Sequence, residues 1–564
     1  MKFFPTNKVP ASAQKLRGGY YTPAVLADYL VAWAIRDGSE RILEPSCGDG
    51  NFIEATLKRL ADITNRSRTV SSSISAIEID RSEIAIAKQR TSKYRDVTEY
   101  ISWYCSDFFR IYGRLANEER FDVVIGNPPF IRFQYFDDES REIAFKHLRA
   151  ADYHPTKLAN AWAAFVQLSV ELLRPGGRLA FVLPAELLQV HYAGELREKL
   201  ACIFEHIVLI GFDQLVFPQI QQEVVLLLAE GKRARMGEPS NIHTLQYKDG
   251  YELLQVKNLD QAVAHLPSKH NRKGLKWTAL FLSAKAFKAL DEAERSGIEM
   301  RLGDLAQVDV GVVTGRNSFF VIQARKAEQL RVNGYVVPVV GRTSALKSIS
   351  FTAKDFEEYS EKHASRLINL SGIDRETFSK ELLEYIALGE ERTINQGYKC
   401  RIRPRWYDVP SVYIPDAFLF RQIHNAPMLV CNRALASSTD TIHRVRVNPG
   451  VDVDLLCAAS INSMTFAWAE VCGRSYGGGV LELEPGEAEQ LPIPYERAAE
   501  LDIEKIDTLL RVGKLKSALD YTDKVLLEEG LGFGKGTVAR IRSAWAELRD
   551  RRMNRRRPRA RRAM

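Results

Sequence analysis

The sequence has few cysteines and no long apolar run, and each absence excludes a class of protein. Its 564 residues include seven cysteines without a Cys-x-x-Cys pair and ten histidines without ligand spacing. We therefore expect no disulfide framework, no structural zinc site and no other resident metal. The densest apolar run, residues 224–229, is strand-sized and far below the ~18 residues of a membrane span. No apolar stretch follows a charged start, so we expect a protein of the reducing cytoplasm.

The net charge of +8 lies in one short segment at the end of the chain. Residues 549–564 hold nine arginines and one aspartate, so the rest of the chain is formally neutral. Bulk charge therefore says little about what the folded domains bind. Two interpretations of this tail stay open: a disordered, solvated end, or an arm that contacts phosphates in a salt-sensitive manner.

Short apolar strands alternate with helical segments in the first part of the chain. We expect strands at residues 41–44, 75–80, 121–125, 178–183, 206–210 and 224–229, with helices between them, such as residues 161–173. Continuous apolar strands joined by helices are typical of a doubly wound α/β sheet that is buried on both faces. Ligands bind such sheets beyond the carboxyl ends of the strands, so we expect the chemistry in the loops that follow strands.

The composition changes twice along the rest of the chain. Residues 232–239 are polar and aperiodic, which predicts a first domain at 1–235 and a mixed α+β domain at 236–497. Residues 498–564 should form C-terminal helices and the basic tail. One apolar stripe at helical spacing marks the last of these helices. Its members are Val538, Ile541, Trp545 and Leu548.

A glycine-containing loop follows the first expected strand and opens a helix. It runs from Glu44 to Gly50, and Gly48 and Gly50 permit a tight turn and the close approach of a ligand. The spacing differs from Gly-x-Gly-x-x-Gly, and no basic residue is present to meet a pyrophosphate. An acid at the start of the loop suits a zwitterionic cofactor with a free amino group, such as S-adenosylmethionine. A purely structural turn is the alternative.

Two further acids follow the next strand ends. Glu78 ends the second expected strand, where a carboxylate can accept both hydroxyls of a ribose. Asp107 precedes Phe108 and Phe109, where an adenine amine and its ring would lie. Each acid alone is more typical of a helix cap or a surface charge. Three acids in chain order at successive strand ends favour a single nucleoside-type site.

The most specific stretch is Asn127-Pro128-Pro129-Phe130, which follows the expected strand at residues 121–125 after Gly126. The prolines fix the backbone and remove two donors, which leaves rigid carbonyls as acceptors. The Asn127 side-chain oxygen and the Pro128 carbonyl could hold both hydrogens of a planar amine and aim its lone pair at a methyl donor. Such catalysis rests on positioning and electrostatics and needs no strong base. A proline turn that only ends a strand is the alternative.

Together these residues resemble the gamma-class, TaqI-like DNA adenine-N6 methyltransferases of restriction-modification systems, from about residue 18 to residue 494. Residues 19–23 are similar to the family's N-terminal cofactor segment, and Thr22 would meet the methionine carboxylate. The resemblance assigns cofactor contacts to Tyr21, Thr22, Glu44, Ser46, Gly48, Gly50, Glu78, Asp107 and Phe165. It assigns catalysis to Asn127, Pro128, Pro129 and Phe130.

The resemblance also assigns stacking on the target base to Phe130 and, from the segment 216–219, to Phe217. Tyrosine is commoner than phenylalanine at the position of Phe130, but the ring face needed for stacking is kept. For Phe217 a place in the core is the alternative, because an aromatic residue after a strand is usually part of the core. A base within a duplex has to be flipped out to reach such a site.

The resemblance implies a seven-stranded class I methyltransferase sheet, followed by a target-recognition domain and C-terminal helices. It implies methyl transfer from S-adenosylmethionine to adenine N6 in double-stranded DNA, without a metal ion. The partners would be duplex DNA and a separately encoded cognate restriction endonuclease. The protein would act as a monomer in the cytoplasm of a bacterium or archaeon, modifying DNA within a restriction-modification system.

The second half of the chain identifies a region and no individual base reader. Segments 311–320, 405–407 and 475–479 resemble parts of the target-recognition domain. Six arginines lie in loop-like contexts that suit guanine readout or phosphate contacts, although any one of them is more typically a surface charge. They are Arg316, Arg342, Arg401, Arg403, Arg405 and Arg433.

Three alternative functions share parts of this pattern. Asn-Pro-Pro-aromatic also resembles enzymes that methylate the glutamine amide of release factors or guanine in ribosomal RNA; the segment around Thr22 and the large second domain favour DNA. A fused endonuclease–methyltransferase would need a nuclease metal site, for which the residues before 18 and the C-terminal helices leave too little chain. A family member that only binds DNA is disfavoured by the intact residues 44–50 and 127–130.

Overall fold

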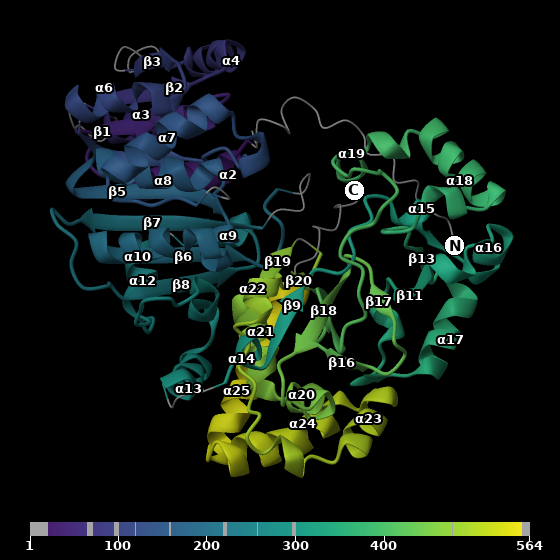
Figure 1. Cartoon of the computed structure of the whole chain (residues 1–564). Helices are drawn as coiled ribbons and strands as arrows, with labels where there is room; N and C mark the ends of the chain where they lie inside the picture. The colour runs from purple at the N-terminus through teal and green to yellow at the C-terminus, as the bar shows by residue number, and fades with distance from the viewer. Residues whose placement is uncertain are drawn as a thin grey trace, which may run out of the picture. The chain divides into compact units, whose positions relative to one another are not determined.

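The computed structural model describes residues 21–64, 72–94, 101–118, 120–156, 159–217, 223–256, 258–295, 300–476 and 478–554 (Figure 1). Two compact units make up the chain. The first comprises Met1–Ala284, Ser475–Gly479 and Arg551–Met564, and the second comprises Lys285–Arg474 and Val480–Asp550. Some predictions lie outside the described residues. They concern residues 19–20, 218–219 and 477 and the tail from residue 555.

The first unit is built on an eight-stranded sheet with the order β3-β2-β1-β4-β5-β7-β6-β8. Its strands are β1 (Arg41–Glu44), β2 (Ser73–Glu78), β3 (Ile101–Cys105), β4 (Phe121–Gly126), β5 (Leu173–Pro184), β6 (Phe204–Phe212), β7 (Val224–Lys232) and β8 (Ile242–Tyr247). Neighbouring strands are parallel except at β7, which is antiparallel to β5 and β6. The doubly wound α/β fold predicted from the sequence is confirmed, and β8 adds an eighth strand to the seven expected.

Two strands were not predicted from the sequence, for different reasons. β3 lies at the edge of the sheet and its residues are half-buried or exposed, so it lacks an apolar run. β8 follows the polar segment 232–239 that predicted a domain boundary at residue 235. Because β8 pairs with β6, the first compact unit continues beyond that point to Ala284.

Helices cover both faces of this sheet. They are α2 (Ala24–Ala34), α3 (Asn51–Thr64), α4 (Arg81–Thr91), α6 (Phe108–Glu118), α7 (Asp138–Ala150), α8 (Ala161–Leu172), α9 (Glu186–Gln189), α10 (Gly194–Ile203), α11 (Gly250–Leu253), α12 (Leu259–Ala264) and the 3-10 helices η1 (Phe133–Tyr135), η2 (His191–Ala193) and η3 (Trp277–Phe281). Apolar residues of α2 and α3 form one core with alternate residues of β1, β2, β4 and β5. Helices α6, α7 and α8 pack together, and α8 packs on β4 and β5. β4 is therefore buried at every position.

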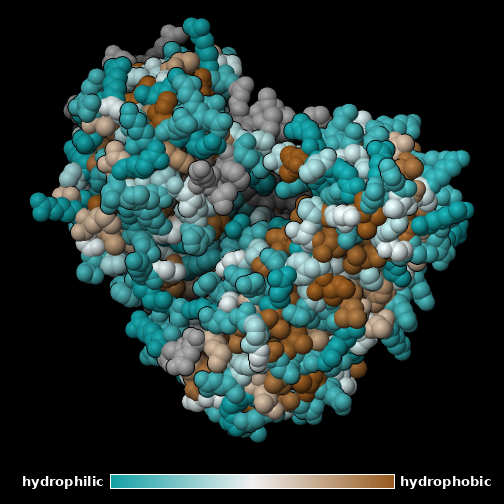
Figure 2. All heavy atoms as spheres, viewed as in Figure 1, coloured by the Kyte–Doolittle hydropathy of each residue, from teal (hydrophilic) through white to brown (hydrophobic). Residues whose placement is uncertain are grey.

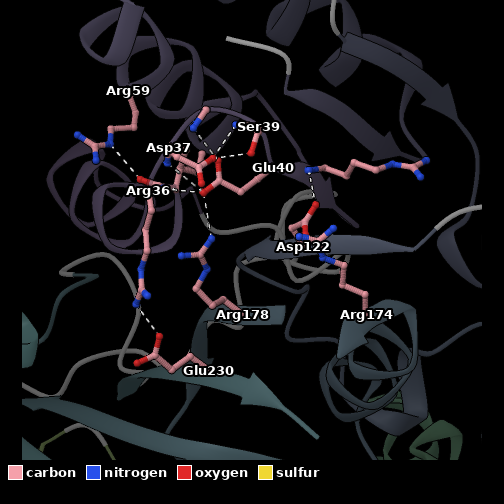
Figure 3. A network of polar contacts seen from close by, with 12 residues as sticks. Arg36, Asp37, Ser39, Glu40, Arg59, Asp122, Arg174, Arg178 and Glu230 are labelled. Atoms are coloured by element: carbon pink, nitrogen blue, oxygen red, sulfur yellow. Dashed lines mark hydrogen bonds and ion pairs between the residues drawn. The ribbon is translucent and has the colours of Figure 1, made fainter. Parts of the chain in front are cut away.

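A buried ion network fixes the amino ends of β1 and β4 (Figure 3). The Glu40 carboxylate is almost fully buried and accepts hydrogen bonds from Arg36 N (2.7 Å), Gly38 N (2.9 Å) and Arg178 Nη2 (3.0 Å). Asp122, at the start of β4, accepts a hydrogen bond from Arg41 N (2.9 Å). With their amino ends fixed in this way, β1 and β4 present their opposite ends to the loops that follow them.

The second unit contains a five-stranded sheet in the order β12-β16-β14-β18-β9 and a four-stranded sheet in the order β10-β13-β11-β17. The strands after residue 300 are β9 (Ala306–Asp309), β10 (Val321–Ile322), β11 (Val336–Val340), β12 (Ser350–Phe351), β13 (Arg366–Ile368), β14 (Ala417–Phe420), β15 (Gln422–Ile423), β16 (Leu429–Asn432), β17 (Ser437–Ser438), β18 (Ile442–Val447), β19 (Arg474–Tyr476) and β20 (Val480–Glu482). Ser475 and Tyr476 of β19 belong to the first unit. On the visible face, hydrophobic residues gather over β11, β16 and β17 (Figure 2). This unit is mixed α+β, as the sequence predicted.

Short helices surround these sheets and longer ones follow them. They are α13 (Ala284–Arg295), α14 (Leu302–Leu305), α15 (Asn317–Phe320), α16 (Ala324–Gln329), α17 (Ala353–Lys362), α18 (Lys380–Glu391), α19 (Tyr398–Arg401), α20 (Val453–Ala459), α21 (Ser463–Cys472), α22 (Pro485–Ala488), α23 (Ile503–Arg511), α24 (Leu515–Asp523), α25 (Lys535–Met553), the 3-10 helices η4 (Asn333–Tyr335), η5 (Thr343–Ala345), η6 (Arg375–Thr377), η7 (Ile394–Gln396) and η8 (Ala498–Glu500), and the π-helix η9 (Lys524–Gly530). In the described part of the chain no single helix has the length and hydropathy of a membrane span; the bent pair α20–α21 passes that test only as a pair, and most of its residues are buried.

The last helix corrects the interpretation of the arginine tail. Helix α25 continues to Met553, and its predicted apolar stripe is buried. The Arg551 guanidinium lies 4.1 Å from the Phe281 ring centroid, and the buried Arg552 donates a hydrogen bond to the Gly479 carbonyl. A disordered end is therefore wrong for these two arginines, because their side chains are used in packing.

Candidate active site

A cavity of about 770 Å³ lies in the first unit, among the loops that follow β1, β2, β3 and β4. Ten of the fourteen predicted site residues line it. They are Tyr21, Thr22, Glu44, Ser46, Gly48, Glu78, Asp107, Asn127, Pro129 and Phe165. Gly50, Pro128, Phe130 and Phe217 are not part of its lining. The topology therefore gathers at one sheet edge residues that are up to 144 positions apart in the chain.

The two glycines of the first loop have different surroundings. Gly48 has a left-handed φ of +50°, and its N–H donates a hydrogen bond to Glu78 Oε2 (3.0 Å). Gly50 has a φ of +85°, and a β-carbon placed there would lie only 2.8 Å from the Ala87 β-carbon of α4. Gly48 thus turns the loop at the cavity, whereas Gly50 allows the loop to pack against α4.

Two carboxylates at the cavity are already held in place. Glu78 Oε1 accepts a second hydrogen bond, from Asp80 N (2.9 Å). Asp107 accepts hydrogen bonds from Phe109 N (2.7 Å) and from the Ser140 hydroxyl (2.6 Å). Ser140 belongs to α7, and the sequence carries no local signal that it would contact a residue 33 positions earlier.

A third carboxylate is in a less favourable environment. Glu44 is 1% exposed, and burial, with the nearby Asp49 and Glu78, raises its pKa well above the usual range. Within the described residues, neither Glu44 Oε2 nor the buried Thr22 hydroxyl has a hydrogen-bond partner. Buried polar atoms left unpaired cost free energy. This cavity wall is therefore suited to a ligand that brings a positive charge and polar groups.

Thr22 reaches the cavity because its backbone is tied to the helix after the glycine loop. Asn51, the first residue of α3, donates a hydrogen bond from Nδ2 to the Thr22 carbonyl (3.3 Å). Arg90 of α4 contacts the Asn51 side chain and forms an ion pair with Asp49 (2.5 Å). Arg90 thus neutralises the charge of Asp49, whereas Glu44 and Glu78 face the cavity.

An aromatic wall adjoins Asp107. The Phe165 ring stacks on Phe108 at a centroid distance of 5.1 Å and an interplanar angle of 17°. It meets Phe109 edge-on at 4.7 Å, and Phe136 lies 5.5 Å from Phe109. All four rings line the cavity. The predicted Phe165 is thus one member of a larger wall, and Phe136 was not predicted from the sequence.

The segment Asn127–Phe130 follows β4, and two hydrogen bonds hold its backbone. The Asn127 carbonyl accepts a hydrogen bond from the Ser46 hydroxyl (3.4 Å), which links it to the glycine loop. The Pro129 carbonyl accepts one from Ile131 N (3.0 Å). Among the described residues, no hydrogen bond is directed to the Pro128 carbonyl. That carbonyl is available as an acceptor for a further group.

The two predicted stacking residues share a core cluster. Phe130 is half-buried and packs against the cluster of the first unit that contains Phe217. Phe217 is only 6% exposed, and residues 218–222 are outside the described part of the chain. Its role in stacking stays a prediction. Among the residues that the structure describes, no group of His, Cys, Asp and Glu side chains could hold a metal ion.

The six arginines named above for the second unit fall into two groups. Arg403 and Arg405 donate hydrogen bonds to backbone carbonyls, and Arg433 pairs with Asp454. Arg316, Arg342 and Arg401 have no ion pair with a described carboxylate. The first group therefore serves the fold, and the second is free to meet a ligand.

Two family models match the chain, one over each unit. Residues 54–217 match the Eco57I restriction-modification methylase family, and residues 274–527 match the C-terminal domain of the type II methyltransferase M.Eco57I. The first match contains the strand ends that line the cavity after β2, β3 and β4. The second covers most of the mixed α+β unit.

Relatives and a solved structure agree with these matches. The type II methyltransferase M.AccI of Acinetobacter calcoaceticus is 24% identical over 83% of this chain and 83% of its own length. M.XamI of Xanthomonas campestris pv. amaranthicola is 22% identical over 85% of each chain. The type IIL restriction-modification enzyme MmeI, solved in complex with DNA, has the same fold over 94% of this chain and 75% of its own, with a TM-score of 0.55 and 13% identity.

Proposed function

Since the chain belongs to the restriction-modification DNA methyltransferases, we propose that it methylates adenine N6 at a defined sequence in double-stranded DNA, with S-adenosylmethionine as the methyl donor. The observation that carries the proposal is the placement of Asn127 in the same cavity as Glu44, Glu78 and Asp107. A side chain able to hold a planar amine thus shares one site with residues able to hold an adenosyl cofactor.

The residues of the cavity fit this cofactor group by group. The unpartnered Glu44 Oε2 would accept hydrogen bonds from the amino group, and the unpartnered Thr22 hydroxyl would donate to the carboxylate. Glu78 would accept the ribose hydroxyls, and Asp107 the adenine amine. The wall around Phe165 would bury the adenine ring. Supporting residues around the carboxylates are already in position, so little reorganisation is needed on binding.

The same geometry supports transfer to an exocyclic amine. When bound, S-adenosylmethionine supplies an electrophilic methyl group. The Asn127 side-chain oxygen and the Pro128 carbonyl would accept the two hydrogens of adenine N6. Holding both hydrogens turns the lone pair of the nitrogen out of the ring plane, and the proton that the product loses can leave through one of these hydrogen bonds to water. Positioning is the main contribution of the protein.

The target base reaches this site only outside the helix, so base flipping is part of the proposal. Phe130 would stack on the flipped base, with Phe217 as a second stacking residue once its side chain is exposed. The second unit would hold the duplex and read its sequence. We further propose that the protein is a monomer of the bacterial or archaeal cytoplasm whose cognate endonuclease is encoded separately.

A labelling experiment tests the substrate. Purified protein is incubated with tritiated cofactor and with plasmid DNA, ribosomal RNA or release factor in parallel. We expect label in DNA alone, and N6-methyladenine in a fixed sequence context when DNA from an expressing host is read by long-read sequencing. Label in RNA or protein with none in DNA would refute the proposal.

A pair of variants tests the catalytic segment. Asn127→Ala should abolish methyl transfer while cofactor binding, measured by calorimetry, stays within a few-fold of wild type, because the side chain contacts the amine and not the cofactor. Asn241→Ala is the matched control, since Asn241 is an exposed asparagine of the same unit that does not line the cavity. Turnover by Asn127→Ala at the rate of this control would contradict the mechanism.

A further inference from the structure

Two segments far apart in the sequence form one surface of the second unit. Residues 313–316 form a turn before α15, and residues 398–403 contain α19. The turn rests on the helix: a β-carbon placed on Gly315 would lie 3.0 Å from the Lys399 β-carbon and 3.2 Å from Cys400 Sγ. Gly315 has a φ of +85°, so glycine serves both the turn and the contact.

Side-chain hydrogen bonds hold the turn at residues 313–316 in place. The Arg403 guanidinium donates hydrogen bonds to the Val313 carbonyl (3.0 Å) and the Thr314 carbonyl (2.9 Å). On the other side of the turn, Asn317 donates a hydrogen bond from Nδ2 to Asp440 (3.1 Å). The surface is therefore built with a fixed geometry, and Arg403 is part of its support and not of its exposed face.

The exposed face carries positive charge without compensation. Arg316, Lys399 and Arg401 are exposed, and none of them has an ion pair with a carboxylate in the described part of the chain. No acid occurs among residues 392–407. Other arginines of this unit, such as Arg421 and Arg511, are paired with carboxylates. Three unpaired cations on one built surface favour a partner that supplies several negative charges.

Two large and exposed side chains, one aromatic and one aliphatic, are next to these basic residues in the sequence. Tyr398 is 65% exposed and Ile402 is 59% exposed. The Lys399 ammonium lies 5.8 Å from the Tyr398 ring centroid. Exposed aromatic and aliphatic groups between basic residues fit a polyanion that also has apolar parts, as the sugars and bases of nucleic acid do.

We infer that Arg316, Tyr398, Lys399, Arg401 and Ile402, here called the basic surface, hold duplex DNA by its phosphates and sugars. The inference rests on the proposed function, because it adds a docking surface for the same substrate. These residues would contact DNA independently of its sequence, and other residues would recognise the bases. An acidic protein would be attracted by the same charges; if that were the partner, the triple variant would keep the wild-type affinity and salt slope for duplex DNA.

The experiment compares the full-length wild type with the triple variant Arg316→Ala, Lys399→Ala, Arg401→Ala. Binding to a fluorescent random-sequence duplex is measured by anisotropy over a series of salt concentrations. The slope of log K against log[salt] should decrease in magnitude by about 0.9 for each phosphate that the variant no longer neutralises. The control variant Arg325→Ala, Lys354→Ala, Lys362→Ala removes the same charge from exposed positions elsewhere in the unit and should keep the wild-type slope.

The outcomes separate the two proposals. If the wild type neither binds nor methylates DNA, the proposed function fails. If the wild type does both and the triple variant keeps its salt slope, only the basic surface is refuted. Equal losses in the triple variant and its control also refute it, because bulk charge would then explain them. Tyr398→Ala, with all charges kept, should weaken binding without changing the slope, whereas binding to an acidic protein would not require the ring.

Discussion

The sharpest structural prediction concerns Glu40, which fixes the amino end of β1 opposite the end that carries Glu44. Glu40→Ala removes one partner of an ion pair in which the Glu40 side chain is 4% exposed and the Arg178 side chain 13% exposed. It also removes the acceptor for Arg36 N and Gly38 N. The guanidinium of Arg178 then stays buried without its ion-pair partner.

The expected cost follows from this burial. Loss of one member of a buried ion pair costs about 3–5 kcal/mol, whereas an exposed pair contributes about 0.2–1 kcal/mol. Replacing both Glu40 and Arg178 by methionine should cost less than Glu40→Met alone, because no buried charge is left unpaired. Glu118→Ala is the control, since the side chains of Arg114 and Glu118 in that pair are 61% and 53% exposed.

Hydrogen–deuterium exchange of the full chain measures the effect where it arises. Peptides that cover β1 and β4 should exchange about a hundredfold faster or more in Glu40→Ala, because local opening there becomes easier by the same free energy. Peptides of the second unit should be unchanged. Exchange no faster than in Glu118→Ala, or a double variant less stable than the single one, would refute the reasoning.

Three further predictions concern the cavity and the loop that packs beside it. The raised pKa of Glu44 means that the unbound protein keeps a proton above the ordinary pKa of 4.5, so cofactor binding should strengthen with rising pH and release a proton. Glu44→Gln should remove that dependence in calorimetry with buffers of different ionisation enthalpy. Gly50→Ala should lower stability by about 2–4 kcal/mol in thermal unfolding, through its φ of +85° and its contact with Ala87. Ser140→Ala should weaken cofactor binding by about 0.5–1.5 kcal/mol, because Asp107 loses a hydrogen bond.

Each of these has an internal control. For Gly50, the control is Gly176→Ala. Gly176 has a similar φ, +80°, but open space around it, so an equal loss of stability in the two variants would exclude the Ala87 contact as the cause. For Ser140, the control is Ser169→Ala, which removes a buried hydroxyl that has no partner among the described residues. For Glu44, a pH dependence that survives in the glutamine variant would assign it to another group. The same raised pKa means that Glu44 lowers stability increasingly as pH rises from 4.5 towards that pKa.

Local patterns determined much of this protein from its sequence alone. Apolar runs of strand length placed β4 and β7, because a strand buried on both faces is apolar at most of its positions. The order of acids after successive strands predicted a shared site, since parallel strands end at one edge of the sheet. The segment Asn127–Phe130 could be recognised because its chemistry depends on adjacent residues.

Tertiary structure decided what depends on contacts between distant segments. Gly50 meets Ala87, Asp107 meets Ser140, and Arg552 is buried against Gly479; no local pattern predicts these pairs. Exposure was decided in the same way. Arg401 and Arg403 are two residues apart in one basic run, yet one faces solvent and the other supports the turn at Val313. A sequence shows which side chains carry charge, but only packing decides whether a charge is used inside the fold or is left to meet a ligand.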